Sequence, residues 1–323
     1  MPVVAAIFAA LTWLGRQRAR AIAAVVFIAI LVPPLDALVK PYVTEAIFAL
    51  LCLAFVRVDT TALQSCVRKP ALVIAATAWT MLALPILFGA SSLSFHLDTR
   101  SPDLFLALML QAVASPMMSA PAFAALMGLD TTLILSTLVA GTAITPFSAP
   151  LFAYVFVGPA LTLSPLALGI KLFAILVGSL VVALLVRRFA GPAAIRRYND
   201  QVDGLNILLV FFFVAAVMEN VGSRFLSDPW DMVGLTALAF AVNFAVLGLS
   251  ALIFAPAGRE RAFLIGLVSS QRNMGLMLAA TGGAVPDFTW LYFALAQFPL
   301  YLAPLLLTPL AQRLKISAAR QAA

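Results

Sequence analysis

Apolar runs of about 20 residues recur along the chain, and short polar or proline-containing connections separate them. An α-helix of this length crosses the hydrocarbon core of a bilayer. The pattern predicts ten spans, at 21–39, 41–57, 71–93, 103–128, 131–158, 165–186, 201–219, 230–255, 261–284 and 288–312. The predicted fold class is therefore an all-α polytopic membrane protein with ten transmembrane helices.

The residues before the first span are also apolar, but the run 2–14 is too short to cross a bilayer. Arg16, Arg18 and Arg20 follow this run, whereas a cleaved signal peptide carries its positive charges first. We therefore expect residues 1–20 to form a segment at the lipid interface or a helix that continues into the first span.

The composition supports a membrane location: 63% of the residues are hydrophobic and 10% are charged. Soluble domains carry about 25% charged residues. The net charge of +7 does not indicate nucleic acid binding, because the basic residues lie in short connections between the apolar runs. No zinc-binding spacing, phosphate loop or nucleophile motif is present in the sequence, so neither an enzyme nor a bound cofactor is expected.

The distribution of the basic residues predicts the orientation. With ten spans, one side of the membrane receives Arg16, Arg18, Arg20, Arg57, Arg68, Lys69, Arg187, Arg188, Arg196, Arg197, Arg259, Arg261, Arg313, Lys315 and Arg320. The other side receives Lys40, Arg100 and Arg224. Because cytoplasmic loops carry the excess of Lys and Arg, we expect a protein of the cell inner membrane with both termini in the cytoplasm.

The ten spans divide into two sets of five around a short uncharged linker at 159–164. The predicted organisation is an N-terminal segment (1–20), a first repeat (21–158), the linker, a second repeat (165–313) and a cytoplasmic tail (314–323). Because five is an odd number, the second repeat enters the membrane from the opposite side. This inverted 5+5 repeat is common among secondary transporters.

Two spans at matching places in the repeats are interrupted. The fourth span contains Pro116 and Pro121, and the ninth contains five consecutive polar residues, 269–273, with Arg272 near the middle of the membrane. Paired interruptions of this kind indicate a binding site at the midplane. The alternative is a polar patch that joins neighbouring helices.

With its broken fourth and ninth spans and the local patterns Ser115-Pro116 and Gln271-Arg272-Asn273-Met274-Gly275-Leu276, the chain resembles the bile acid:sodium symporter family over residues 20–315. The resemblance implies that the two broken helices cross at the centre of the membrane. It also implies that a panel of spans packs against a core bundle and that sodium binds beside the crossing.

The chain departs from that family at its sodium ligands. The position of the family's glutamate in the ninth helix falls on Val268 and that of its glutamine on Arg272, whereas Asn273 matches. In the fourth helix the family's polar ligands fall near Pro121 and Ala122, which have no side-chain oxygen. We therefore expect no use of the family's sodium sites, because a hard cation needs several oxygen ligands.

Arg272 places a permanent positive charge where sodium would supply one, and its guanidinium suits a carboxylate. The candidate substrate-binding residues are Arg272, Asn273, Gln271, Ser270, Ser269, Ser115 and Ser119. Each serine or amide could instead cap a broken helix. Arg272 could alternatively form an internal, proton-coupled pair with an acid, of which Glu45 is the most plausible partner.

The sequence leaves three functions open. The first is a secondary transporter of a small organic anion, without sodium coupling, that acts by alternating access as a facilitator, a proton-coupled carrier or an exchanger. The second is a sodium-coupled organic anion or bile acid symporter with shifted sodium ligands. The third is a membrane receptor or assembly subunit that binds without transport.

Overall fold

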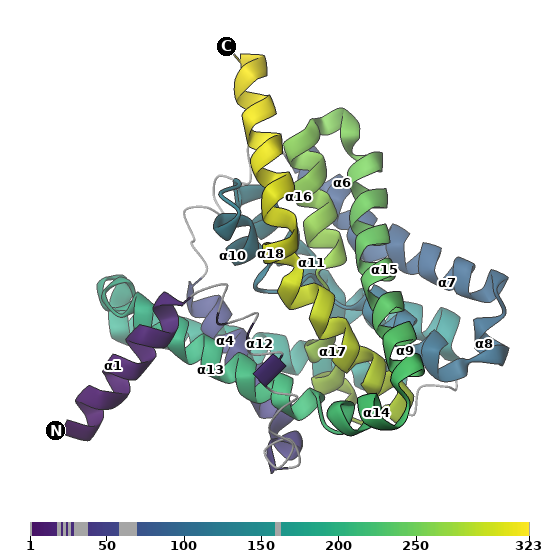
Figure 1. Ribbon diagram of the computed structural model, residues 1–323, viewed down its shortest axis with the longest axis horizontal. Helices are drawn as coiled ribbons and strands as arrows, with labels where there is room; N and C mark the ends of the chain where they lie inside the picture. Colours follow the sequence, from purple (N-terminus) through teal and green to yellow (C-terminus); the bar gives the residue numbers. More distant parts are fainter. Residues whose placement is uncertain are drawn as a thin grey trace. The chain divides into compact units, whose positions relative to one another are not determined.

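The computed structural model describes residues 2–17, 21, 24, 27–28, 38–57, 70–158 and 163–322. The predicted first span and predicted linker lie largely outside these residues. Apart from one isolated β-bridge, the regular structure of the described part is helical, as the apolar runs predict (Figure 1). A helix satisfies its backbone polar groups internally, which a lipid environment requires.

The chain divides into two compact units, and each half of the sequence contributes to both. Unit 1 contains Met1–Val58 and Phe173–Met232, and unit 2 contains Asp59–Leu172 and Val233–Ala323. In each half the earlier spans thus belong to unit 1 and the later spans to unit 2.

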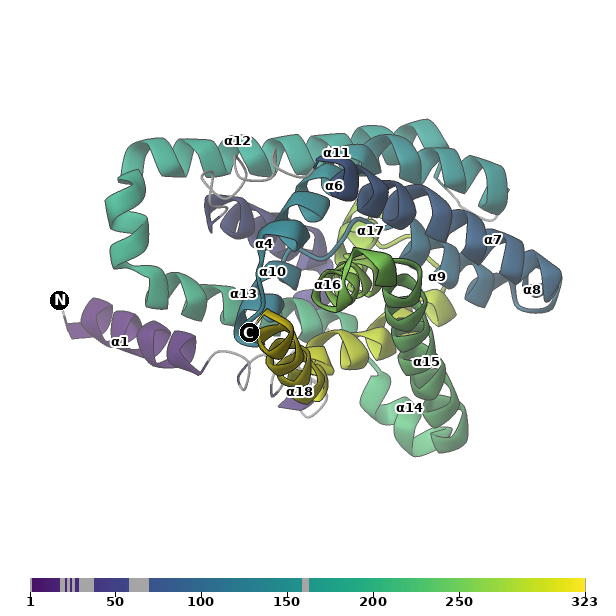
Figure 2. The ribbon, with the colours of Figure 1, turned by 90° about the horizontal axis from the view of Figure 1, so that it is seen from above.

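Unit 1 is built around α13 (Asn199–Val217). Its other elements are α1 (Pro2–Arg16), the 3-10 turn η1 (Lys40–Tyr42), α4 (Val43–Arg57), α14 (Val221–Ser227) and the part of α12 (Pro165–Arg197) from Phe173 onward. α12 bends at Gly191, whose positive φ of 77° suits a residue without a side chain (Figure 2).

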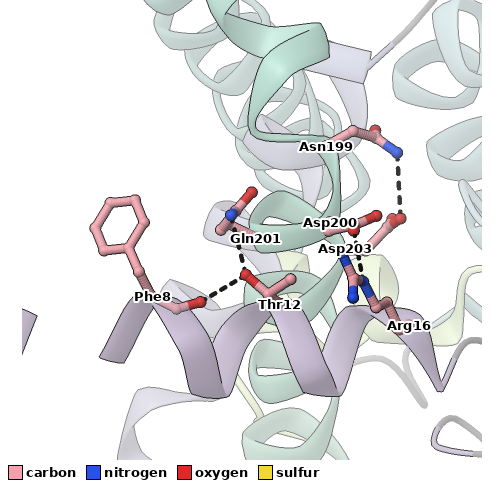
Figure 3. A network of polar contacts seen from close by, with 7 residues as sticks. All are labelled: Phe8, Thr12, Arg16, Asn199, Asp200, Gln201 and Asp203. Atoms are coloured by element: carbon pink, nitrogen blue, oxygen red, sulfur yellow. Dashed lines mark hydrogen bonds and ion pairs between the residues drawn. The ribbon is translucent and has the colours of Figure 1, made fainter. Parts of the chain in front are cut away.

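α1 and α13 run side by side in both views, and two glycines allow the approach (Figures 1 and 2). A Cβ atom on Gly15 would lie 2.0 Å from the Asp200 carbonyl oxygen, and one on Gly204 would lie 2.0 Å from the Leu11 carbonyl oxygen. Polar contacts reinforce the pair, as Figure 3 shows: Arg16 Nε donates to Asp200 at 3.0 Å and Gln201 donates to Thr12 at 3.0 Å.

Unit 2 holds most of α15 (Pro229–Ile253) and the elements that form the candidate site. These are α6 (Pro70–Ala78), the π-helical turn η3 (Trp79–Ala83), α7 (Leu84–Ser94), α8 (Leu97–Arg100), α9 (Pro102–Val113), α10 (Ala120–Leu126), α11 (Thr132–Phe152), the π-helical turn η4 (Ala153–Val157), the 3-10 turn η6 (Ala255–Ala257), α16 (Arg259–Ser270), α17 (Met274–Thr281) and α18 (Asp287–Ala322). α16 can lie close to α15 because Gly266 has no side chain: a Cβ atom there would stand 2.5 Å from the carbonyl oxygen of Leu247.

Six helices of the described part are long and apolar enough to cross a membrane: Pro70–Ser94, Thr132–Val157, Pro165–Arg197, Asn199–Val217, Pro229–Ile253 and Asp287–Leu314. Large apolar side chains such as Leu166, Ile170 and Phe189 are exposed along α12. A water-soluble surface rarely carries such a row, whereas lipid accommodates it. The fold is that of an all-α membrane protein.

The helix ends differ from the prediction at three places. α12 continues past 186 to a kink at Gly191, whose dihedrals are not helical, and a further helical segment then runs to Arg197. α18 continues to Ala322, so the predicted tail is helical. Arginine, lysine and alanine are strong helix formers, so a basic segment marks a membrane boundary without ending a helix. α4, with 15 residues, is shorter than a typical span.

Candidate functional site

The fourth predicted span is interrupted between α9 and α10. After α9, Ala114 has extended dihedrals (φ −61°, ψ 149°), and the helix resumes at Ala120. Pro116 lies inside the interruption; it lacks a backbone N–H and disfavours helical dihedrals at Ser115. Pro121 lies in the first turn of α10, where a helix offers its N–H groups no partner.

The ninth predicted span is interrupted between α16 and α17. α16 ends at Ser270, Gln271 has extended dihedrals (φ −81°, ψ 95°), and α17 begins at Met274. Arg272 therefore lies at the centre of a three-residue connection between two half-helices. The polar run places the interruption within one turn of its position in the structure.

The two interruptions pair with each other. Pro116 and Arg272 form an isolated antiparallel bridge. Two backbone hydrogen bonds of 2.8 Å flank it, from Met117 N–H to Gln271 O and from Asn273 N–H to Ser115 O. We call the paired segments, 115–117 and 271–273, the break ribbon. The ribbon satisfies backbone groups that the loss of helix would otherwise leave buried without partners.

The guanidinium of Arg272 is buried, with 3% of the residue exposed, and it binds backbone oxygens. Nη1 donates to the carbonyl of Ala114 at 2.9 Å, and Nη2 donates to the carbonyl of Thr80 at 2.7 Å. The sulfur of Met81 lies 4.0 Å from Nη1. No carboxylate in the described part of unit 2 forms an ion pair with Arg272. Carbonyl dipoles therefore stabilise this charge without neutralising it.

Thr80 lies in η3, a π-helical turn in the long helix that runs from Pro70 to Ser94. Its hydroxyl is 2.9 Å from the hydroxyl of Ser269, and the indole of the adjacent Trp79 donates to Ser250 at 2.8 Å. π-Helical turns occur frequently at functional sites. Thr80 was not identifiable from the sequence, because it is one of two threonines, with Thr77, within an apolar run.

Two further predicted site residues are held by the protein itself. The hydroxyl of Ser270 donates to the carbonyl of Leu267 at 3.1 Å, and its carbonyl accepts a 3.1 Å hydrogen bond from Asn243. The side chain of Asn273 accepts a 3.0 Å hydrogen bond from the N–H of Leu276 and so caps α17. With Ser269 bonded to Thr80, these residues shape the site.

Other predicted site residues have polar atoms without partners. The Gln271 side chain is fully buried, and neither atom of its amide has a hydrogen-bond partner in the described part of the chain. The same holds for the hydroxyls of Ser115 and Ser119. Burying an amide without hydrogen-bond partners is energetically costly, so this side chain is not explained by the packing of the described residues alone.

Gly141 of α11 packs against the ribbon. A Cβ atom at this glycine would lie 2.9 Å from Cδ of Pro116 and 3.3 Å from the sulfur of Met81. α11 can therefore reach the proline only because this position has no side chain. Gly141 does not stand out in the sequence, since a glycine within a membrane helix is common.

The remaining predicted positions, Glu45 and Val268, are not residues of the ribbon. Glu45, the suggested acidic partner, is an exposed residue of α4 in unit 1. Val268, at the family's glutamate position, is fully buried in an apolar cluster with Leu264 and with Ala120 and Ala124 of α10. Among the described residues, no group of three His, Cys, Asp or Glu side chains is placed to hold a metal ion.

A scan against protein-family models finds no match to this chain, and a search of curated proteins finds no significant match.

Proposed function

We propose that this protein is a secondary transporter that moves a small organic anion across the inner membrane by alternating access, without the sodium sites of the bile acid:sodium symporters that it resembles. The observation that carries the proposal is the break ribbon. Two interrupted helices from opposite halves of the chain pair within one unit, and a buried, uncompensated guanidinium lies at their junction.

The architecture supports ten spans in an inverted repeat. Six described helices are long enough to span, and the interrupted pairs α9–α10 and α16–α17 occupy the two predicted broken spans. The remaining two spans would be α4, preceded by η1, and the segment 21–39. Both halves divide between the units in the same way, which suits a repeat whose first spans form a panel and whose later spans form a core.

Ion pairs within unit 1 support the predicted grouping of charged residues by side of the membrane. Arg16 pairs with Asp200, and Arg57 pairs with Asp203. The predicted topology places all four residues on the cytoplasmic side. Lys40 pairs with Glu219, and the same topology places both residues on the outer side. Each ion pair thus joins residues that the charge distribution assigns to one face of the membrane.

The contacts of Arg272 suit a group that replaces a bound cation. In secondary transporters, carbonyls at unwound backbone and at the C-terminal ends of half-helices coordinate the coupling ion. Arg272 binds the carbonyl of Ala114, which follows the end of α9, and that of Thr80 in a π-helical turn. Its charge, with the N-termini of α10 and α17, favours an anion near the ribbon.

The test is uptake of labelled organic anions into proteoliposomes under a sodium gradient, under a proton gradient and without either. We expect uptake that does not depend on sodium. Arg272→Gln is expected to abolish uptake, whereas Arg261→Gln, at an exposed arginine of α16, is expected to retain it. The melting temperature of each variant separates loss of transport from loss of folding.

Two other results would replace this assignment. Uptake that requires a sodium gradient would indicate a sodium-coupled symporter with shifted ligands. Saturable binding of an anion without flux under any gradient would indicate a receptor or assembly subunit.

A further inference from the structure

The break ribbon has two faces. Pro116 and Arg272 stand opposite each other, and the two hydrogen bonds that flank them make this a non-hydrogen-bonded pair. The side chains of such a pair lie close together on one face, and those of the neighbouring residues point to the other. Ser115 and Gln271 therefore belong to the face opposite Arg272.

The Arg272 face is filled by protein. Thr80 binds the guanidinium, and the Met81 sulfur lies beside it. Gly141 packs against Pro116 from α11, with no space for a Cβ atom. These contacts come from the long helix that carries η3 and from α11. A ligand cannot reach this face without displacing them.

The opposite face carries the unpartnered polar atoms. Gln271 is fully buried and Ser115 is 1% exposed, and in the described residues neither the amide nor the hydroxyl has a partner. Met117 and Asn273 belong to the same face and are half-buried, whereas Pro116 and Arg272, on the other face, are buried. This face therefore combines free hydrogen-bonding groups with the less enclosed side of the ribbon.

We propose, on the basis of the transport function proposed above, that the substrate is a hydroxycarboxylate whose hydroxyl donates to Gln271 and whose carboxylate accepts from Gln271 and Ser115, and that Arg272 is a positioning residue. A carboxylate only accepts hydrogen bonds, so it could pair with the amide N–H but would leave the Gln271 oxygen unpaired. A hydroxyl next to the carboxylate donates to that oxygen, while the anion accepts from Gln271 and Ser115. Arg272 holds the ribbon and contributes its charge through it.

The experiment compares matched anions that differ by one hydroxyl. Mandelate is paired with phenylacetate and lactate with propionate, and each is tested for uptake into proteoliposomes and for thermal stabilisation of the purified protein. Wild-type protein is expected to prefer the hydroxylated member of a pair by about tenfold or more, because the deoxy analogue leaves the amide oxygen unpaired.

The variants Gln271→Met and Ser115→Ala separate recognition from folding. In the described residues the replaced polar atoms have no partner, so the ligand-free melting temperature is expected to stay the same or rise while the preference for the hydroxyl is lost. Thr281→Val is the matched control. Its buried hydroxyl bonds to carbonyls of its own helix, so the preference is expected to persist.

Equal uptake of both members of each pair, or a preference that survives in Gln271→Met, would overturn the hydroxyl site and leave the transporter assignment standing. A lower ligand-free melting temperature in Gln271→Met would also overturn it, because the amide would then have a structural partner. Neither uptake nor stabilisation by any of the four anions would overturn both proposals.

Discussion

Arg272 donates a 2.7 Å hydrogen bond to the backbone carbonyl of Thr80. The two residues are far apart in the sequence but meet inside unit 2. The bond links the interruption of the ninth predicted span to a π-helical turn of the third. With the bond to Ala114, it makes the guanidinium a three-way junction between the third, fourth and ninth predicted spans.

Arg272→Lys is expected to lower stability by about 1–3 kcal/mol, because one ammonium cannot reproduce a planar fork that reaches two carbonyls. Arg272→Met should lower the free energy of unfolding further, since the carbonyls of both Ala114 and Thr80 lose this hydrogen-bond donor. Thermal unfolding in detergent measures the difference, with Arg261→Met as an exposed control that is expected to change little. Wild-type stability of Arg272→Met would show that the guanidinium does not hold the junction.

Gly141→Ala is expected to destabilise the protein by about 1–3 kcal/mol, because the added Cβ atom would stand 2.9 Å from the rigid ring of Pro116. Gly248→Ala provides the control: this exposed glycine of α15 has no atom within 4 Å of a Cβ, so the higher helix propensity of alanine should be neutral or stabilising. If both variants unfold at the same temperature, the close contact between α11 and the ribbon is wrong.

Tyr292→Phe is expected to lower the free energy of unfolding by about 1–3 kcal/mol, because the phenol donates a 2.7 Å hydrogen bond to the buried amide oxygen of Gln111. The double variant with Gln111→Leu should recover part of the loss, since it removes the unpaired oxygen as well. A double-mutant cycle of unfolding free energies tests this. Strictly additive losses would mean that the two side chains do not interact.

Gly204→Val is expected to release α1 from α13, because the crossing leaves no space for a side chain beside the carbonyl of Leu11. Hydrogen–deuterium exchange of residues 5–16 should become faster. Asp200→Asn weakens only the exposed ion pair with Arg16, which contributes about 1 kcal/mol or less, so exchange should change little. The reverse order would mean that charge, and not close packing, attaches α1.

The sequence predicts the membrane-spanning helices because they follow a local pattern of apolar residues. It predicts the two interruptions because they depart from that pattern. Pro116 and the polar run around Arg272 stand out against apolar surroundings. Thr80 and Gly141 did not stand out, because their importance arises from partners in other predicted spans. The different roles that we propose for Arg272 and Gln271, neighbours in sequence, depend on the alternation of side chains in the ribbon, which a helical pattern does not predict.

The positions of helix ends were less predictable from the charged residues. The charge pattern predicts a membrane boundary at Arg187 and Arg188, but these residues do not end the helix, which continues to the kink at Gly191. Charge distribution thus predicts topology, whereas backbone preference decides where a helix ends.

The mutual pairing of the two interruptions also restricts how the molecule can move. Their freed amides and carbonyls bond to each other, so separating the segments would expose both sets in surroundings that offer no water. The two segments of the break ribbon should therefore move together as a rigid body in any conformational cycle. The flexing that opens a path to either compartment would then fall to elements outside it.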